Sequence, residues 1–90
     1  MDASPRCPHP VLARDARALV GLLAVIEGEA TASPLDADVR ARVSRRFTSV
    51  GLLPDGADDR EFRQALNDLN QRLRYALGEY DDPPHPMPVP

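Results

Sequence analysis

Apolar residues recur every three or four positions along three stretches of the chain, a spacing that places side chains on one face of an α-helix. It predicts helices over about residues 11–28, 34–50 and 58–78. Three amphipathic helices without a strand-like alternation indicate an all-α fold, either a small three-helix bundle or a helical hairpin with an additional helix. Six residues on these stripes are expected to be the most buried: Leu19, Leu23, Val39, Val43, Leu66 and Leu69.

Residues that favour helix ends flank these stretches. Ser33 is suited to cap the second helix, with Pro34 at its first position. Asp58 and Glu61 have the spacing of a capping box at the start of the third helix. Glycines at positions 28, 51 and 78 are expected to end the three helices.

The first predicted helix carries a second apolar stripe. The run Ala18–Ile26 has no charged residue, and Ala18, Leu22 and Val25 lie well away from the stripe that contains Leu19 and Leu23. One interpretation places this helix centrally, between the other two. The other makes Ala18, Leu22 and Val25 a partner-binding surface, either for a second copy of the chain with the first helices opposed or for another protein.

Charge is unevenly distributed along the 90 residues, whose formal net charge is −3. Arginines concentrate in the segment Arg40–Arg46, whereas the last forty residues are acidic. A mildly acidic chain argues against tight, non-specific binding to nucleic acid or to a membrane surface. Acids placed four residues before arginines predict ion pairs along the helices: Asp36–Arg40, Asp38–Arg42, Asp59–Arg63 and Asp68–Arg72. Arg45 and Arg46 have no such acid, which makes them candidates for an external contact.

The residues that usually carry chemistry are few. Cys7 is the only cysteine, so no disulfide can form within the chain, and His9 and His85 both lie in proline-rich ends. A general base must be held within hydrogen-bond reach of its proton, and the sequence provides no ordered setting for either histidine. We therefore expect no catalytic residues, no bound metal and no cofactor, and a protein that is not an enzyme.

Prolines concentrate at both ends, in residues 1–10 and 80–90. Because proline lacks an amide donor, both segments are expected to be flexible, disordered tails around one helical domain of residues 11–79. Removing residues 83–90 is expected to leave the melting temperature almost unchanged. The start MDASPRCPHP has no hydrophobic signal core, and the nine-residue apolar run is shorter than the roughly 20 residues of a membrane span. A cytoplasmic protein is expected, and the use of Arg for all eleven basic residues is typical of a GC-rich bacterial genome.

These observations favour a non-catalytic helical module for protein–protein interaction. We expect a small accessory or regulatory subunit that acts through a helix face and its tails, with a protein partner or a homodimer. The alternative is a small DNA-binding transcriptional regulator that uses Arg40–Arg46.

Overall fold

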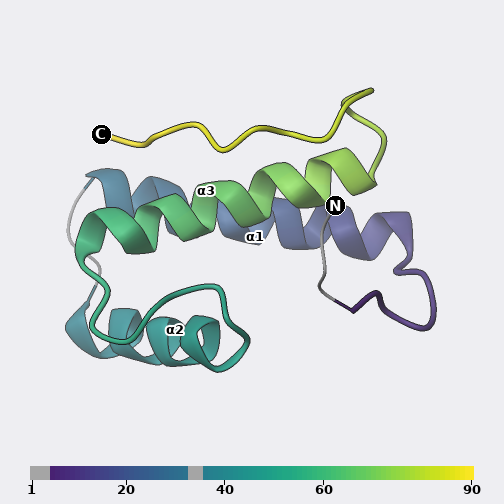
Figure 1. The fold of residues 1–90 in the computed structure, drawn as a ribbon. Helices are drawn as coiled ribbons and strands as arrows, with labels where there is room; N and C mark the ends of the chain where they lie inside the picture. Colours follow the sequence, from purple (N-terminus) through teal and green to yellow (C-terminus); the bar gives the residue numbers. More distant parts are fainter. Residues whose placement is uncertain (1–4, 33–35) are drawn as a thin grey trace.

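The computed structural model describes residues 5–32 and 36–90. Three α-helices follow one another: α1 (Ala13–Ala32), α2 (Ala37–Ser49) and α3 (Asp59–Ala76). Helices α1 and α3 lie side by side and run in opposite directions, and α2 lies on one side of this pair, near the start of α3 (Figure 1). The all-α architecture predicted from the apolar spacing is confirmed, and the described residues contain no strand.

The helix ends follow the predicted chemistry in part. Asp58 Oδ1 accepts a hydrogen bond from the amide of Glu61, and Glu61 Oε1 accepts one from the amide of Asp58, which confirms the capping box. Gly51 and Gly78 follow the C-cap residues of α2 and α3 and adopt positive φ angles of 82° and 83°, a conformation that terminates helices. Gly28 does not end α1, which continues to Ala32.

The start of α2 differs from the prediction. Ser33 and Pro34 lie outside the described residues, and α2 begins at Ala37. Asp36 is its cap, because Asp36 Oδ1 accepts hydrogen bonds from the amides of Asp38 and Val39. A capping carboxylate also interacts favourably with the positive end of the helix dipole.

The core forms where the three helices and the α2–α3 loop meet. Phe62 and Leu66 of α3 are fully buried. The ring of Phe47 in α2 packs against Phe62 with the ring centroids 6.2 Å apart. The core cluster consists of Leu23, Leu53, Phe62, Ala65 and Leu66, and the partly buried side chains packed against it are Ile26, Val43, Phe47, Ala57, Leu69 and Leu73.

Two of the six residues expected to be most buried are exposed. Leu19 retains 46% of its accessible surface, because α1 is covered chiefly by α3 and the α1 residues buried by the packing are Ala16 and Leu23. Val39 retains 47%, because α2 packs against the core through Val43 and Phe47, farther along the helix. Leu23 and Leu66 are buried as predicted.

The proline-rich carboxyl-terminal segment runs back along α3 (Figure 1). Its main chain hydrogen-bonds to two α3 side chains: Arg60 Nε donates to the carbonyl oxygen of Val89, and Gln64 contacts both Met87 and Val89. The flexibility expected of residues 80–90 stays a prediction, but these contacts oppose it.

Candidate interaction surfaces

The outer face of α1 is an apolar surface left open by the packing of the helices. Leu22 and Val25 retain 60% and 64% of their accessible surface, and Ala18 beside them is also exposed. The interpretation that α1 is enclosed between the other two helices is therefore wrong. Helix α3 covers one side of α1, and α2 lies too far towards one end to cover the other (Figure 1). Leu12 and Leu19, also exposed, extend the apolar surface.

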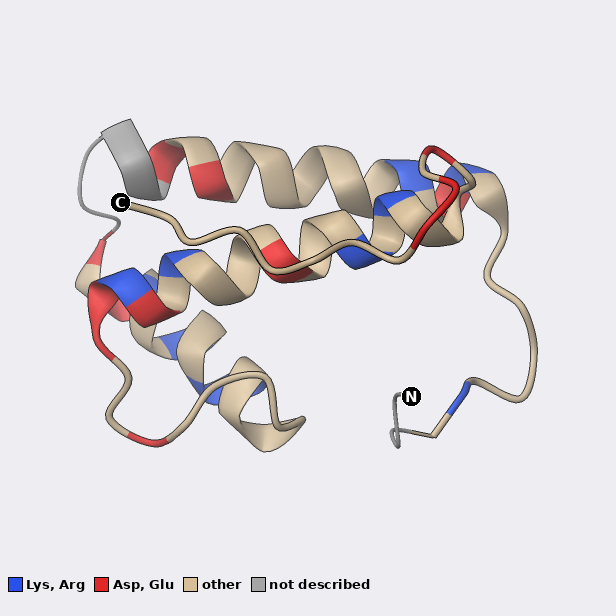
Figure 2. Ribbon diagram, turned by 45° about the horizontal axis from the view of Figure 1, so that its top comes forward, with Lys and Arg blue, Asp and Glu red and all other residues tan. Residues whose placement is uncertain are grey.

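Charges flank this apolar face in an order opposite to the one that stabilises a helix. Arg14 and Arg17 lie near the start of α1, and Glu27 and Glu29 lie towards its end, with uncharged residues between them (Figure 2). The last turn contains no basic residue. Because the helix dipole favours acids at the start and bases at the end, this placement costs α1 some stability. Asp15, 3.8 Å from Arg14, offsets part of the cost in the first turn.

The arginines of α2 have separate environments. Arg40 lies over the Phe62 ring, 5.6 Å from its centroid, with Nε 3.8 Å from Asp59 Oδ1. The predicted Asp36–Arg40 pair is not formed, since Asp36 caps the helix instead. Arg45 and Arg46 are exposed and, with Arg42, Val43 and Ser49, line a shallow hollow of about 520 Å³.

Of the other three predicted ion pairs, two are formed. Arg42 Nη2 lies 3.1 Å from Asp38 Oδ2, and Arg63 Nε lies 3.0 Å from Asp59 Oδ2, so both pairs are confirmed. Asp68 does not form its predicted pair with Arg72 among the described residues. Its Oδ1 instead accepts a hydrogen bond from Gln64 Nε2 at 2.8 Å.

A polar groove of about 510 Å³ lies between α1 and α3. Its floor contains Asn70, which is 2% exposed: Asn70 Nδ2 donates to the carbonyl oxygen of Val20, and its Oδ1 accepts from Arg74 Nε. Asn67 Nδ2 donates to Glu27 Oε2 at 3.3 Å near the same groove. The bonds from Asn70 to Val20 and from Asn67 to Glu27 join α3 to α1. The polar side chains of the groove therefore stabilise the packing of these two helices. The sequence interpretation missed Asn70, although a polar residue four positions after Leu66 interrupts the α3 stripe.

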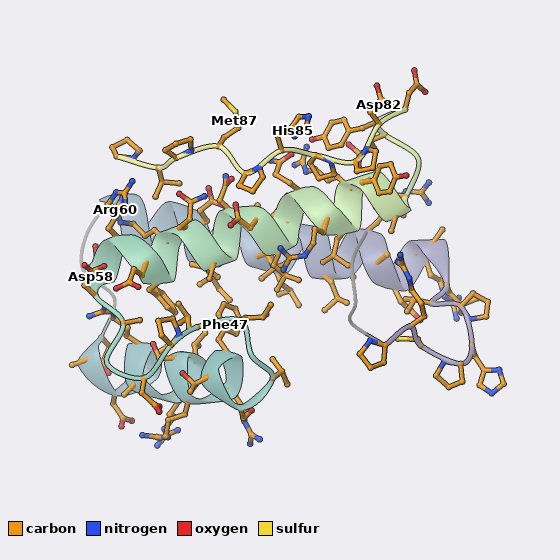
Figure 3. The ribbon with its side chains drawn as sticks, in the orientation of Figure 1. Phe47, Asp58, Arg60, Asp82, His85 and Met87 are labelled. Atoms are coloured by element: carbon orange, nitrogen blue, oxygen red, sulfur yellow. The ribbon has the colours of Figure 1, made fainter. Side chains whose placement is uncertain are left out.

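The cysteine and the two histidines lie on the surface of the molecule. Cys7, His9 and His85 are all exposed, and His85 lies on the segment beside α3 (Figure 3). The described part of the chain holds no group of three His, Cys, Asp or Glu side chains arranged for a metal ion. Within those same residues, each helix is too short or too polar to cross a lipid bilayer.

The structure thus places the expected partner-binding residues on two surfaces. Ala18, Leu22 and Val25 share the α1 face, whereas Arg45 and Arg46 belong to the hollow on α2. Compared with models of protein families, with curated proteins and with solved structures, the chain shows no match.

Proposed function

We propose that this protein is a non-catalytic helical interaction module whose α1 face binds a second copy of the chain. The observation that carries the proposal is the exposure of Leu22 and Val25 at 60% and 64% on a helix that is covered chiefly from one side. A small domain gains from burying such surface, at about 25 cal/mol per Å² of apolar area. A partner subunit is a common source of that stability in short chains.

The charges of α1 favour a second copy in antiparallel orientation. With the two-fold axis passing between Gly21 and Leu22, Ala18 lies opposite Val25 and Arg14 lies opposite Glu29 of the other copy. Arg14 and Glu29, which both oppose the dipole of their own helix, then each face an opposite charge across the interface. Surface ion pairs contribute little affinity, so this complementarity sets the orientation of the dimer.

The size of the surface limits the strength of this contact. Specific interfaces usually bury about 800 Å² per partner. Ala18, Leu22 and Val25 cover only part of such an area, so Leu19 and Leu12 beside them must contribute as well. Gly21 presents no side chain there, and a Cβ at Gly21 would meet no atom of its own chain within 4 Å. Packing within the chain therefore does not require glycine at this position. The missing side chain instead allows two α1 helices to approach closely.

Sedimentation of the wild type and of two neighbouring variants tests the proposal. The wild type is expected to sediment as a dimer at tens of micromolar. Leu22→Glu should give a monomer with unchanged helicity, whereas Leu23→Glu, which places a charge in the core, should unfold the chain. A monomeric wild type overturns the dimer, and a Leu22→Glu chain that unfolds like Leu23→Glu overturns the contact face.

A DNA-binding regulator is the second candidate, favoured by the three arginines that line the hollow on α2. Contacts to phosphate release counterions, so such binding weakens steeply as salt rises. A gel-shift series against salt concentration distinguishes the candidates. Sequence-selective binding that persists at physiological salt and is lost on Arg45→Ala/Arg46→Ala would support the regulator, and weak binding without sequence preference would exclude it.

A further inference from the structure

The contact between Gln64 and the carboxyl-terminal segment has the form of peptide recognition. Gln64 Nε2 donates to the carbonyl oxygen of Met87 at 2.8 Å, and Gln64 Oε1 accepts from the amide of Val89 at 2.9 Å. A single side-chain amide therefore pairs with the carbonyl of one residue and the amide of the residue two positions later. The residue between them, Pro88, has no amide to pair.

The neighbouring side chains hold this arrangement in place. The second N–H of Gln64 donates to Asp68 Oδ1 at 2.8 Å, which fixes the rotation of the side-chain amide. Arg60 Nε adds a third contact to the segment, to the carbonyl oxygen of Val89 at 3.2 Å. Arg60 lies beside the end of the segment, and the side chain of Met87 points away from α3 (Figure 3). All three contacts are made to the main chain of the bound segment.

The surface continues along α3 beyond Gln64. Asp68, Gln71 and Arg72 line one side of a hollow of about 140 Å³, and Pro84, His85 and Pro86 line the other. Tyr80 Oη donates to Gln71 Oε1 at 2.7 Å, which places the turn that leads into the segment. The segment therefore follows α3 from Gln71 back to Arg60, a length typical of a bound peptide.

We propose that the face of α3 formed by Arg60, Gln64, Asp68 and Gln71 is a binding site for extended peptides that contain proline. In this structure the site is occupied by the chain's own Met87–Val89 and the residues before it. The contacts pair with the carbonyl of one residue and with the amide and carbonyl of the residue two positions later, and none depends on a covalent link to α3. Proline-rich peptides suit such a site because they are already extended and lose little entropy on binding.

The covalent connection between the carboxyl-terminal segment and α3 limits the access of other peptides to the site. A tethered segment has an effective concentration of the order of millimolar, so it outcompetes a free peptide of equal intrinsic affinity. A peptide from another molecule therefore binds when the chain's own segment is weakened or displaced. This site lies on α3 and is independent of the proposed contact face on α1.

The test uses the full chain with its own segment weakened by Val89→Pro, which removes the amide that Gln64 binds. A fluorescently labelled peptide of residues 83–90 is titrated in, and its anisotropy is measured. The peptide is expected to bind the Val89→Pro chain more tightly than the wild type, whose site is occupied. Adding Gln64→Ala should weaken binding roughly ten-fold, the effect expected from two lost hydrogen bonds. A peptide that carries Val89→Pro loses only the bond between its amide and Gln64, so it should bind more weakly by a few-fold.

Asn67→Ala in the Val89→Pro chain is the matched control, because Asn67 is a side-chain amide of the same helix that contacts Glu27 instead. It should leave peptide affinity unchanged. Equal binding with and without Gln64→Ala, or no saturation at millimolar peptide, overturns the proposal. Amide exchange at Val89 in the wild-type chain provides a second measurement: slow exchange that becomes fast on Gln64→Ala supports the site, and fast exchange in the wild type refutes it.

Discussion

Asn70 Nδ2 donates a hydrogen bond to the main-chain carbonyl oxygen of Val20 at 3.2 Å, and this bond joins α3 to α1 in the interior. The same side chain accepts from Arg74 Nε at 2.8 Å, so both ends of a nearly fully buried amide are paired. A buried side chain whose donor and acceptor are both hydrogen-bonded favours one relative position and orientation of the two helices that it joins. This bond therefore stabilises the packing in which α3 covers the Leu23 side of α1 and leaves Leu22 and Val25 exposed.

Replacing Asn70 with alanine is expected to lower the free energy of unfolding by about 1–3 kcal/mol, because Arg74 loses its acceptor and a small void remains. Urea denaturation followed by circular dichroism measures the change. Asn67→Ala, at a half-buried position on the same helix, should cost less. An Asn70→Ala chain as stable as Asn67→Ala would show that the bond to Val20 contributes nothing.

Leu66→Ala tests the core, since Leu66 is fully buried at the centre of the cluster. The loss of buried surface and the cavity left behind should cost roughly 2–5 kcal/mol, enough to unfold much of so small a domain. Thermal unfolding at low protein concentration measures the effect. Leu22→Ala is the matched control, because the same side-chain change on an exposed position should alter the monomer little.

Removing residues 83–90 is now expected to destabilise the chain, in contrast to the expectation from composition. Three hydrogen bonds between the segment and α3 are lost, and part of their contribution is offset by the entropy that the freed segment regains. A net loss of about 1 kcal/mol corresponds to a fall of roughly 4–8 °C in Tm. An unchanged Tm would instead support the expectation from composition that this segment is flexible.

The helices and the centre of the core were accessible from sequence because they depend on local rules. The spacing or geometry of neighbouring residues accounts for the apolar stripe of α3, the capping box at Asp58 and the helix ends at Gly51 and Gly78. Leu53 was missed because it lies in a loop, where no period marks it as buried. The exposure of Leu19 and Val39 was missed because apolar spacing identifies a face but not how far the partner helix extends over it.

The proposed contact face on α1 could be predicted from local sequence, whereas the proposed peptide site on α3 could not. Ala18, Leu22 and Val25 form a stripe that helical geometry alone separates from the core stripe. The site around Gln64 arises from residues about 25 positions apart, and it depends on the path that the segment takes after Gly78. Proline content predicts that this segment is extended but gives no information about what it lies against.

The antiparallel dimer predicts a specific response to exchanging charges on α1. Glu29→Arg alone places two arginines opposite each other at both ends of the interface and should weaken the dimer by a few-fold to about ten-fold, the size expected for two exposed pairs. Arg14→Glu alone should do the same with two acids. The double variant Arg14→Glu/Glu29→Arg restores opposite charges across the two-fold axis, so its affinity should return to that of the wild type. Sedimentation equilibrium measures the four dissociation constants, those of the wild type and of the three variants.

The helix dipole makes this test more discriminating, because each single reversal improves the charge placement on its own helix. The variants are therefore expected to raise the thermal stability of the monomer slightly while weakening the dimer, a combination that general damage to the fold cannot produce. A parallel dimer would face residue 14 with residue 14 and residue 29 with residue 29, so like charges would meet in the wild type and in every variant, and no variant would weaken the dimer. Dissociation constants that stay equal across all four chains would therefore refute the antiparallel orientation, and a dimer that weakens further in the double variant would refute the pairing of Arg14 with Glu29.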